Sequence, residues 1–169
     1  MTSAASRVVT RLASMQPADR SAVRSVLEST SRFRPSELAV AVEVFDSAFG
    51  LNGMDRDPDY KFVGAFDEQR ELLGFAAYGP TPDTDNTWDL YWIAVAEKAQ
   101  GRGVGAVLLA EVEKRIASVG GRLLMVETSS RDDYDRTRSF YESRGYRLEA
   151  RIKDFYEPSD DRLMLTKEL

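Results

Sequence analysis

The sequence predicts an α/β fold of the α+β type, in which helices flank a mixed central sheet. Three observations predict this class. Apolar residues recur at helical spacing early in the chain, a hairpin-like pair of apolar runs follows, and a later apolar run turns through glycines into another helical pattern. Because strands and helices alternate only in part, a mixed sheet is expected rather than an all-parallel one.

The first 50 residues predict one short strand and two helices. The strand is expected at Arg7–Arg11. The first helix begins near Pro17 and carries apolar residues on one face, and the second runs from Pro35 to Gly50. Proline at the start and glycine at the end are typical helix boundary signals.

The middle of the chain predicts a hairpin, a strand and a long helix. Apolar runs at Tyr60–Phe66 and Leu72–Tyr78 flank the polar turn Asp67–Glu71. A further strand is expected at Leu90–Val95, and apolar residues then recur every four positions from Val104 to Val119. That spacing is typical of a helix with one buried face.

The last third predicts a strand at Leu123–Val126, a helix at about Tyr134–Arg144 and two strands near Tyr146–Ile152 and Leu163–Thr166. No repeat, linker or composition change is visible. We therefore expect a single domain over residues 1–169, a length sufficient for a proper hydrophobic core.

Composition excludes several kinds of chemistry. The chain contains no cysteine and no histidine, so a disulfide, a thiolate zinc site, a cysteine nucleophile and an imidazole base are all excluded. The net charge of −5 argues against a nucleic-acid surface, which usually needs a basic patch. No apolar stretch approaches the roughly 20 residues that span a bilayer. A cytoplasmic protein is the default expectation.

The segment from Gln100 to Ala106 is rich in glycine and lies between a predicted strand and a predicted helix. Unpaired N–H groups at a helix start, together with the helix dipole, form a site for anions such as phosphate. The nucleoside-triphosphate loop does not fit these residues, and the dinucleotide pattern fails because Leu108 stands where its third glycine belongs.

This segment resembles the Gln/Arg-x-x-Gly-x-Gly/Ala motif of the GNAT superfamily of N-acetyltransferases, with Gln100, Gly103 and Gly105 at the defining positions. Around it, Trp88–Val95 and Arg122–Thr128 resemble the fourth and fifth strands of that family. Tyr134–Tyr146 resembles its next helix and strand, with a Phe-Tyr-x-x-x-Gly-Tyr signature. The resemblance implies a mixed, mostly antiparallel sheet of about six to seven strands flanked by about four helices.

The resemblance also implies that acetyl-CoA is the co-substrate. No metal is expected, because the Asp55–Asp59 run lacks the glycine and glutamate of a calcium loop. The pyrophosphate of acetyl-CoA would lie against the main chain of the glycine-rich segment, and Arg102 adds a candidate side-chain contact. The main chain of the fourth strand would bind the pantetheine arm. Tyr134 stands where the family often has a cofactor-binding asparagine, which puts that contact in doubt. The implied cofactor-binding residues are Ile93, Ala94, Val95, Gln100, Gly101, Arg102, Gly103, Val104, Gly105, Ala106 and Tyr134.

Two residues carry the expected catalysis. Tyr141 matches the family tyrosine that donates a proton to the CoA sulfur. Glu127 resembles the strand glutamate that accepts a proton in ribosomal-protein alanine N-acetyltransferases. Asp89 and a chain of water molecules are the alternative bases. Structural alternatives are a core role for Tyr141, although the wholly apolar Phe140 is the better core candidate, and pairing of Glu127 with an arginine or a backbone donor.

The expected function is acetyl-CoA-dependent transfer of an acetyl group to a primary amine of a small molecule or a protein N-terminus, by direct attack on the thioester. The alternative is a catalytically silent acyl-CoA-binding domain that senses or regulates. No nucleic-acid or membrane partner is expected. Homodimers are common in the family, but the sequence shows no interface signal, and it does not identify the acceptor or its acyl-chain preference.

Overall fold

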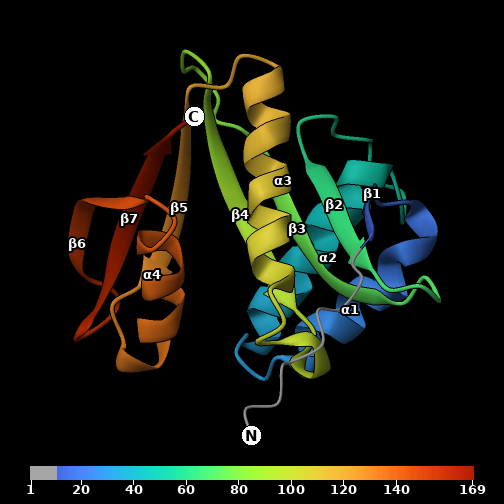
Figure 1. Cartoon of the computed structure of the whole chain (residues 1–169), viewed down its shortest axis with the longest axis horizontal. Helices are drawn as coiled ribbons and strands as arrows, with labels where there is room; N and C mark the ends of the chain where they lie inside the picture. The colour runs from blue at the N-terminus through green and yellow to red at the C-terminus, as the bar shows by residue number, and fades with distance from the viewer. Residues whose placement is uncertain (1–10) are drawn as a thin grey trace, which may run out of the picture. The chain divides into compact units, whose positions relative to one another are not determined.

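The computed structural model describes residues 11–169, so the predicted strand residues 7–10 lie outside the described part. Within these described residues the chain forms seven strands, four α-helices and three short 3₁₀ turns. In chain order these elements are β1 (Arg11–Ser14), η1 (Pro17–Asp19), α1 (Arg20–Ser29), α2 (Pro35–Phe49), β2 (Lys61–Phe66), β3 (Leu72–Pro80), β4 (Thr87–Val95), η2 (Glu97–Ala99), α3 (Val104–Ser118), β5 (Leu123–Ser129), η3 (Asp132–Tyr134), α4 (Asp135–Glu142), β6 (Arg147–Glu157) and β7 (Asp160–Glu168) (Figure 1).

The strands follow the hydrogen-bonded order β1-β2-β3-β4-β5-β7-β6. The pairs β1–β2, β2–β3, β5–β7 and β6–β7 are antiparallel, whereas β4 and β5 run parallel. The predicted mixed, mostly antiparallel sheet with four helices is therefore confirmed.

Contacts divide the chain into two compact units. The first comprises residues up to Gly79 together with Trp92–Lys114, and the second comprises Pro80–Tyr91 and Arg115–Leu169. The single domain expected over residues 1–169 stays a prediction.

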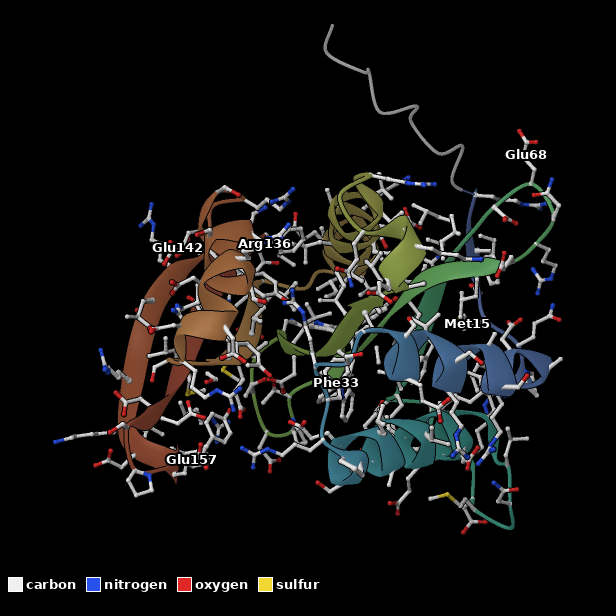
Figure 2. All side chains as sticks on the ribbon, turned by 90° about the horizontal axis from the view of Figure 1, so that it is seen from below. Met15, Phe33, Glu68, Arg136, Glu142 and Glu157 are labelled. Carbon is white, nitrogen blue, oxygen red and sulfur yellow. The ribbon has the colours of Figure 1, made fainter. Side chains whose placement is uncertain are left out.

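The first unit has an aromatic core between α2 and the β2–β3 hairpin. The Phe45 ring lies 5.0 Å from that of Phe62, which in turn lies 6.1 Å from Phe75. Met15, just after β1, is also buried (Figure 2). Burying one such side chain contributes about 1.5–3 kcal/mol, so this cluster is a main source of stability for the unit.

The boundaries of α2 follow from its sequence. Pro35 occupies the first turn, and the Glu37 carboxylate accepts a hydrogen bond from the Arg34 N–H at 2.7 Å. Gly50 ends the helix in the left-handed conformation, with φ of +65°. This conformation is accessible to glycine at little cost, which explains why the helix stops there.

The second unit contains a β-hairpin that is longer than the sequence predicts. The strand expected at Tyr146–Ile152 becomes Arg147–Glu157, and the one expected at Leu163–Thr166 becomes Asp160–Glu168. The pairing of β6 with β7 is irregular between Ile152 and Glu157. The sequence prediction ended this strand at Ile152, where the irregularity begins.

No helix within residues 11–169 is long and apolar enough to cross a membrane. In the same part of the chain, no group of three or more His, Cys, Asp or Glu side chains is arranged to hold a metal ion.

A buried carboxylate joins α1 to α2. Asp46 accepts two hydrogen bonds from Arg20, at 2.5 and 2.8 Å, and a third from the Asn52 amide at 2.7 Å. Its side chain is only 7% exposed. The hydrogen bonds from Arg20 lower the pKa of Asp46 despite the opposing effect of burial.

We predict that Asp46→Asn destabilises the protein by about 1–3 kcal/mol at pH 7, because donors that now face a carboxylate lose a charged acceptor. The folded-state pKa of Asp46 lies below that of an unfolded aspartate, about 3.9, so its contribution is present above that pH and lost as the pH falls through the folded value. Denaturant unfolding of wild type and variant at pH 7 and at pH 3 measures the difference.

Glu28→Gln is the matched control, because Glu28 forms an exposed pair with Arg24 in α1. That change should cost less than about 1 kcal/mol. Equal losses in Asp46→Asn and Glu28→Gln, or a difference that grows as the pH falls, would contradict the stabilising role of Asp46.

Candidate functional site

The start of α3 is formed by two glycines in a backbone conformation that other residues rarely adopt. Gly101 has φ of +74° and Gly103 has φ of +84°. The first helical hydrogen bond runs from the Val107 N–H to the Gly103 carbonyl at 3.1 Å. The glycines therefore turn the chain into the helix and leave the preceding N–H groups outside its hydrogen-bond ladder.

Six successive N–H groups, from Gly101 to Ala106, make no hydrogen bond with another residue of the described part of the chain. A Cβ built on Gly101 or Gly103 would meet no atom within 4 Å. The loop thus combines unused donors, the positive end of a helix dipole and open space beside the main chain. This arrangement fits a diphosphate.

The loop is held from its N-terminal side. The Gln100 amide donates to the Val95 carbonyl at 3.2 Å, and the Glu97 N–H donates to the Ser29 hydroxyl at 3.2 Å. Ala99 is buried. Gln100 therefore connects the end of β4 to the glycine-rich loop through its side chain, which is a structural role for this motif residue.

Gly74 on β3 is a contributor that the sequence reasoning missed. A Cβ at this position would lie 2.7 Å from the Ala94 carbonyl oxygen and 3.2 Å from side-chain atoms of both Val104 and Leu108. Only a glycine allows β4 and the first turns of α3 to approach β3 this closely. The available signal was a glycine inside a strand pattern, which often marks such an approach.

The predicted pantetheine-binding residues lie at the end of β4. The pairing of β4 with β5 runs from Thr87 with Leu123 to Leu90 with Val126, and β4 continues to Val95. The Val95 carbonyl already accepts the hydrogen bond from Gln100.

Tyr141 lies on α4 and is the most deeply buried of the predicted catalytic residues, with 3% of its surface exposed. Its hydroxyl makes no hydrogen bond with another described residue. Burial raises the pKa of the Tyr141 phenol above its usual range. The group therefore stays protonated at neutral pH and remains able to donate.

The residues after Tyr141 explain its signature. Gly145, with φ of +89°, ends the helical segment, and the Tyr146 N–H then donates to the Tyr141 carbonyl at 3.2 Å. The rings of Tyr141 and Tyr146 meet at 5.4 Å in an edge-to-face arrangement. The glycine thus brings the second tyrosine back against the first.

Two expectations about α4 need correction. Phe140 is not the better core residue: it is half-buried, with the Arg144 guanidinium 4.0 Å from its ring centre, whereas Tyr141 is buried. Tyr134 lies in the 3₁₀ turn η3, and α4 begins at Asp135. The apolar character of Phe140 was a poorer guide than its position on the helix.

Glu127 on β5 has two side-chain partners. Its Oε1 accepts a hydrogen bond from the Tyr156 hydroxyl at 2.5 Å, and its Oε2 lies 2.5 Å from the Arg162 Nη2. The side chain is 39% exposed. Pairing with an arginine, which the sequence left as an alternative, is therefore present, and Tyr156 and Arg162 are neighbours that the sequence did not identify.

Asp89, the alternative base, accepts a hydrogen bond from the Thr81 hydroxyl at 2.6 Å. Thr81 follows β3 and Asp89 belongs to β4. Asp89 is thus hydrogen-bonded by a neutral hydroxyl, whereas Glu127 also has the cationic Arg162 as a partner.

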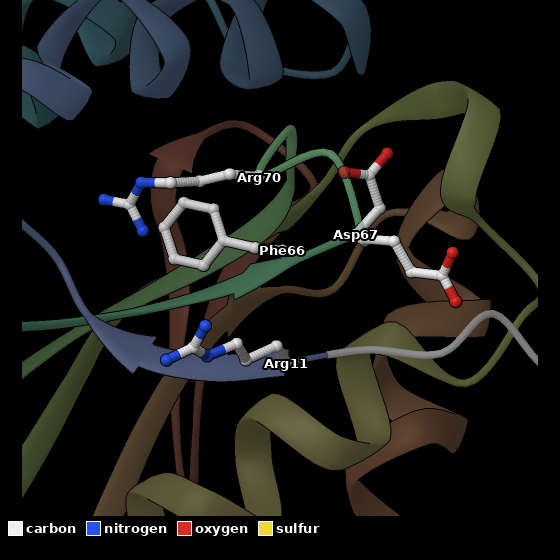
Figure 3. A pocket seen from close by; sticks show the side chains of 5 residues that line it. Arg11, Phe66, Asp67 and Arg70 are labelled. Carbon is white, nitrogen blue, oxygen red and sulfur yellow. The ribbon is translucent and has the colours of Figure 1, made fainter.

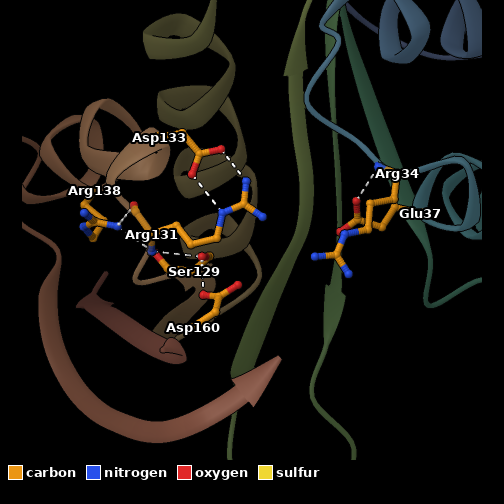
Figure 4. A network of polar contacts seen from close by, with 7 residues as sticks. All are labelled: Arg34, Glu37, Ser129, Arg131, Asp133, Arg138 and Asp160. Carbon is orange, nitrogen blue, oxygen red and sulfur yellow. Dashed lines mark hydrogen bonds and ion pairs between the residues drawn. The ribbon is translucent and has the colours of Figure 1, made fainter. Parts of the chain in front are cut away.

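The connection between β5 and α4 is fixed by Ser129 (Figure 4). Its hydroxyl donates to Asp160 at 2.5 Å and accepts from the Arg131 N–H at 3.1 Å. Arg138 donates to the carbonyls of Ser129 and Arg131, both at 2.8 Å. These contacts set the start of the segment that carries Tyr134 and Tyr141.

A pocket at the β2–β3 turn lies elsewhere in the first unit (Figure 3). There the Arg70 guanidinium is 4.7 Å from the centre of the Phe66 ring. The pocket is lined by Arg11, Phe66, Asp67, Glu68 and Arg70. None of the predicted site residues belongs to it.

The predicted site residues belong to both compact units. The glycine-rich loop and the end of β4 belong to the first unit, and Glu127, Tyr134 and Tyr141 belong to the second.

Comparisons with known proteins agree with this fold. The model of the acetyltransferase (GNAT) family matches residues 24–146. A crystal structure from Desulfovibrio desulfuricans, assigned to the GNAT family of acetyltransferases, is 42% identical with a TM-score of 0.88, covering 95% of this chain and 99% of the other. No curated protein matches the chain.

More distant structures share the fold. The ribosomal-protein-S18-alanine N-acetyltransferase from Escherichia coli is 16% identical with a TM-score of 0.76, covering 95% of this chain and 94% of its own. An aminoglycoside 6′-N-acetyltransferase complexed with coenzyme A is 19% identical with a TM-score of 0.72, covering 94% and 96%. Because the family model spans well over half of the sequence, this chain belongs to the GNAT family of N-acetyltransferases.

Proposed function

We propose that this protein uses acetyl-CoA to acetylate a primary amine, by direct attack of the amine on the thioester. The observation that carries the proposal is the row of six unused N–H groups from Gly101 to Ala106 at the start of α3. Acetyl-CoA supplies the activated acetyl group, and the chain's own residues bind it and handle the protons.

The main chain of residues 101–106 would hold the diphosphate of acetyl-CoA. The helix dipole alone contributes about 0.3–1 kcal/mol, so most of the binding must come from the convergent hydrogen bonds. Arg102 is exposed in the same loop and adds a positive charge. The main-chain groups of Ile93–Val95 would bind the pantetheine arm.

Proton transfer would be divided between Glu127 and Tyr141. An acceptor ammonium loses one proton to the Glu127 carboxylate, which leaves a nitrogen lone pair for attack. Tyr141, with its protonated and unengaged hydroxyl, would donate to the sulfur as the C–S bond breaks. The nitrogen loses its second proton as the amide forms, and that proton restores the Tyr141 phenol. A positioned acid of this kind contributes typically 10²–10⁴-fold to the rate.

The acceptor would be a small amine or a protein N-terminus. A net charge of −5 favours encounter with a cationic amine over an anionic one. The structural neighbours act on a ribosomal-protein alanine and on aminoglycosides, and one is associated with phosphinothricin, so these three amine classes form a sensible first panel. We expect the enzyme to act in the cytoplasm, either alone or as a homodimer.

We predict that saturating acetyl-CoA raises the melting temperature, whereas NAD and ATP raise it little. At 100 times its Kd, a ligand stabilises by about 2.7 kcal/mol, or roughly 5–10 °C for a chain of this size. Differential scanning fluorimetry with the three ligands measures this. Equal shifts from all three would contradict a specific acetyl-CoA site.

A matched pair of variants tests whether acetyl-CoA binds at the glycine-rich loop. Gly103 and Gly120 both have positive φ, and a Cβ on either would meet nothing within 4 Å. Gly103→Ala and Gly120→Ala should therefore lose similar stability, but only Gly103→Ala should weaken acetyl-CoA binding by calorimetry. Equal affinity in both variants would exclude Gly103 from the binding loop.

We predict that Tyr141→Phe keeps acetyl-CoA affinity and loses turnover by about 10²-fold or more, because it removes only the donating hydroxyl. Thiol release with the amine panel measures turnover. Tyr146→Phe is the control, since it removes the same atom from the neighbouring ring and should keep most of the activity. An unchanged rate in Tyr141→Phe would remove this residue from the mechanism.

A further inference from the structure

Glu127, Tyr156 and Arg162 form a cluster in which both oxygens of one carboxylate are held. The Tyr156 hydroxyl donates to Oε1 and the Arg162 Nη2 pairs with Oε2, each at 2.5 Å. Arg162 pairs in the β-ladder with Ser129, two residues beyond Glu127, so both side chains lie on the same side of the sheet. The cluster is thus built by the pairing of β5 with β7 and by the irregular last residues of β6, which include Tyr156.

The two donors are themselves held in place. The Arg162 guanidinium lies 4.9 Å from the centre of the Phe155 ring, and Arg162 is 26% exposed. The Phe155 and Tyr156 rings meet edge to face at 5.0 Å. Burial, followed by the hydrogen bond to Glu127, raises the pKa of the Tyr156 phenol, so Tyr156 remains a donor.

This cluster is not needed to attach the β6–β7 hairpin to β5. Seven register pairs already join β5 to β7. At the turn, Ser129 donates to Asp160, the Asp161 N–H donates to the Ser130 hydroxyl at 2.8 Å, and Arg151 pairs with Asp161. The Glu127 side chain is also 39% exposed, so its ion pair with Arg162 adds little to stability.

A carboxylate held at both oxygens keeps one orientation and still has acceptor capacity. Each carboxylate oxygen has two lone-pair sites, and one site on each is engaged here. The remaining sites of Glu127 can accept a hydrogen bond or a proton from an incoming amine. Holding a base in place in advance matters because a displacement of about 1 Å can cost about 10²-fold in rate.

We infer that Tyr156 and Arg162 are positioning residues, which hold Glu127 in the orientation that receives the proton of the acceptor amine. The inference rests on the proposed acetyl transfer. In the step concerned, one N–H bond of the acceptor ammonium breaks, its proton forms an O–H bond with Glu127, and the electron pair stays on nitrogen.

A double-mutant cycle tests whether Tyr156 and Arg162 act through Glu127. Rates are measured by thiol release with whichever amine of the panel is acetylated fastest. Tyr156→Phe and Arg162→Met should each lower kcat about 10- to 100-fold, with unchanged acetyl-CoA affinity. In a Glu127→Gln background the same changes should cost less than about twofold, because the group they position no longer accepts a proton.

Two further variants separate positioning from stability. Arg162→Lys keeps the charge and should recover most of the rate lost in Arg162→Met. Arg151→Met removes another arginine–carboxylate pair from the same hairpin and should leave kcat nearly unchanged. An equal loss in Arg151→Met would mean that hairpin stability alone is being measured, which would overturn the inference.

A readout without turnover checks the contact itself. Tyrosine ionisation, followed by NMR of ¹³Cζ-labelled tyrosine, should give a lower Tyr156 pKa in Glu127→Gln, because the neutral amide no longer opposes formation of the phenolate. An unshifted titration, or rate losses that add fully in the cycle, would overturn the inference while leaving acetyl transfer intact. Wild-type protein that binds acetyl-CoA but acetylates no amine of the panel would overturn the proposed function and this inference with it.

Discussion

The row of unpaired N–H groups at the start of α3 is the constraint on which the proposed chemistry depends. It exists because Gly101 and Gly103 take the left-handed conformation and start the helix without closing its first hydrogen bonds. The helix cannot shift to close them, since Val104 and Leu108 are buried against β3 at Gly74. Packing in the first unit therefore holds the start of α3 in place with these N–H groups unpaired.

Local signals in the sequence were sufficient for the glycine-rich loop and for the end of α4. Gly103 and Gly145 need conformations that few other residues adopt, so their spacing from Gln100 and Tyr141 is visible without a structure. The same is true of Pro35 and Gly50 at the two ends of α2. In each case the physical cause lies within a few residues of the signal.

Contacts between distant segments could not be predicted in the same way. Tyr156 and Arg162 lie 29 and 35 residues beyond Glu127 in the sequence, and the approach of Arg162 depends on the register of β5 with β7. The early start of β7 was missed because Asp160 and Asp161 are typical loop residues. Both are buried here, with hydrogen-bond partners on the Ser129–Ser130 segment. Periodicity contains no information about such partners.

Tyr141 and Tyr156, both in the second unit, differ in burial and in what their hydroxyls contact: Tyr141 is buried, whereas Tyr156 is 40% exposed. Burial raises the pKa of both phenols, so both keep their protons at neutral pH. The Tyr156 hydroxyl donates a hydrogen bond to Glu127, whereas the Tyr141 hydroxyl has no partner among the described residues. A phenol that packs its ring but leaves its hydroxyl unengaged gives up the stability of a hydrogen bond, about 0.5–1.5 kcal/mol. Phenylalanine would avoid that loss at position 141, and the proposed donation from Tyr141 to the departing sulfur gives a reason for tyrosine there.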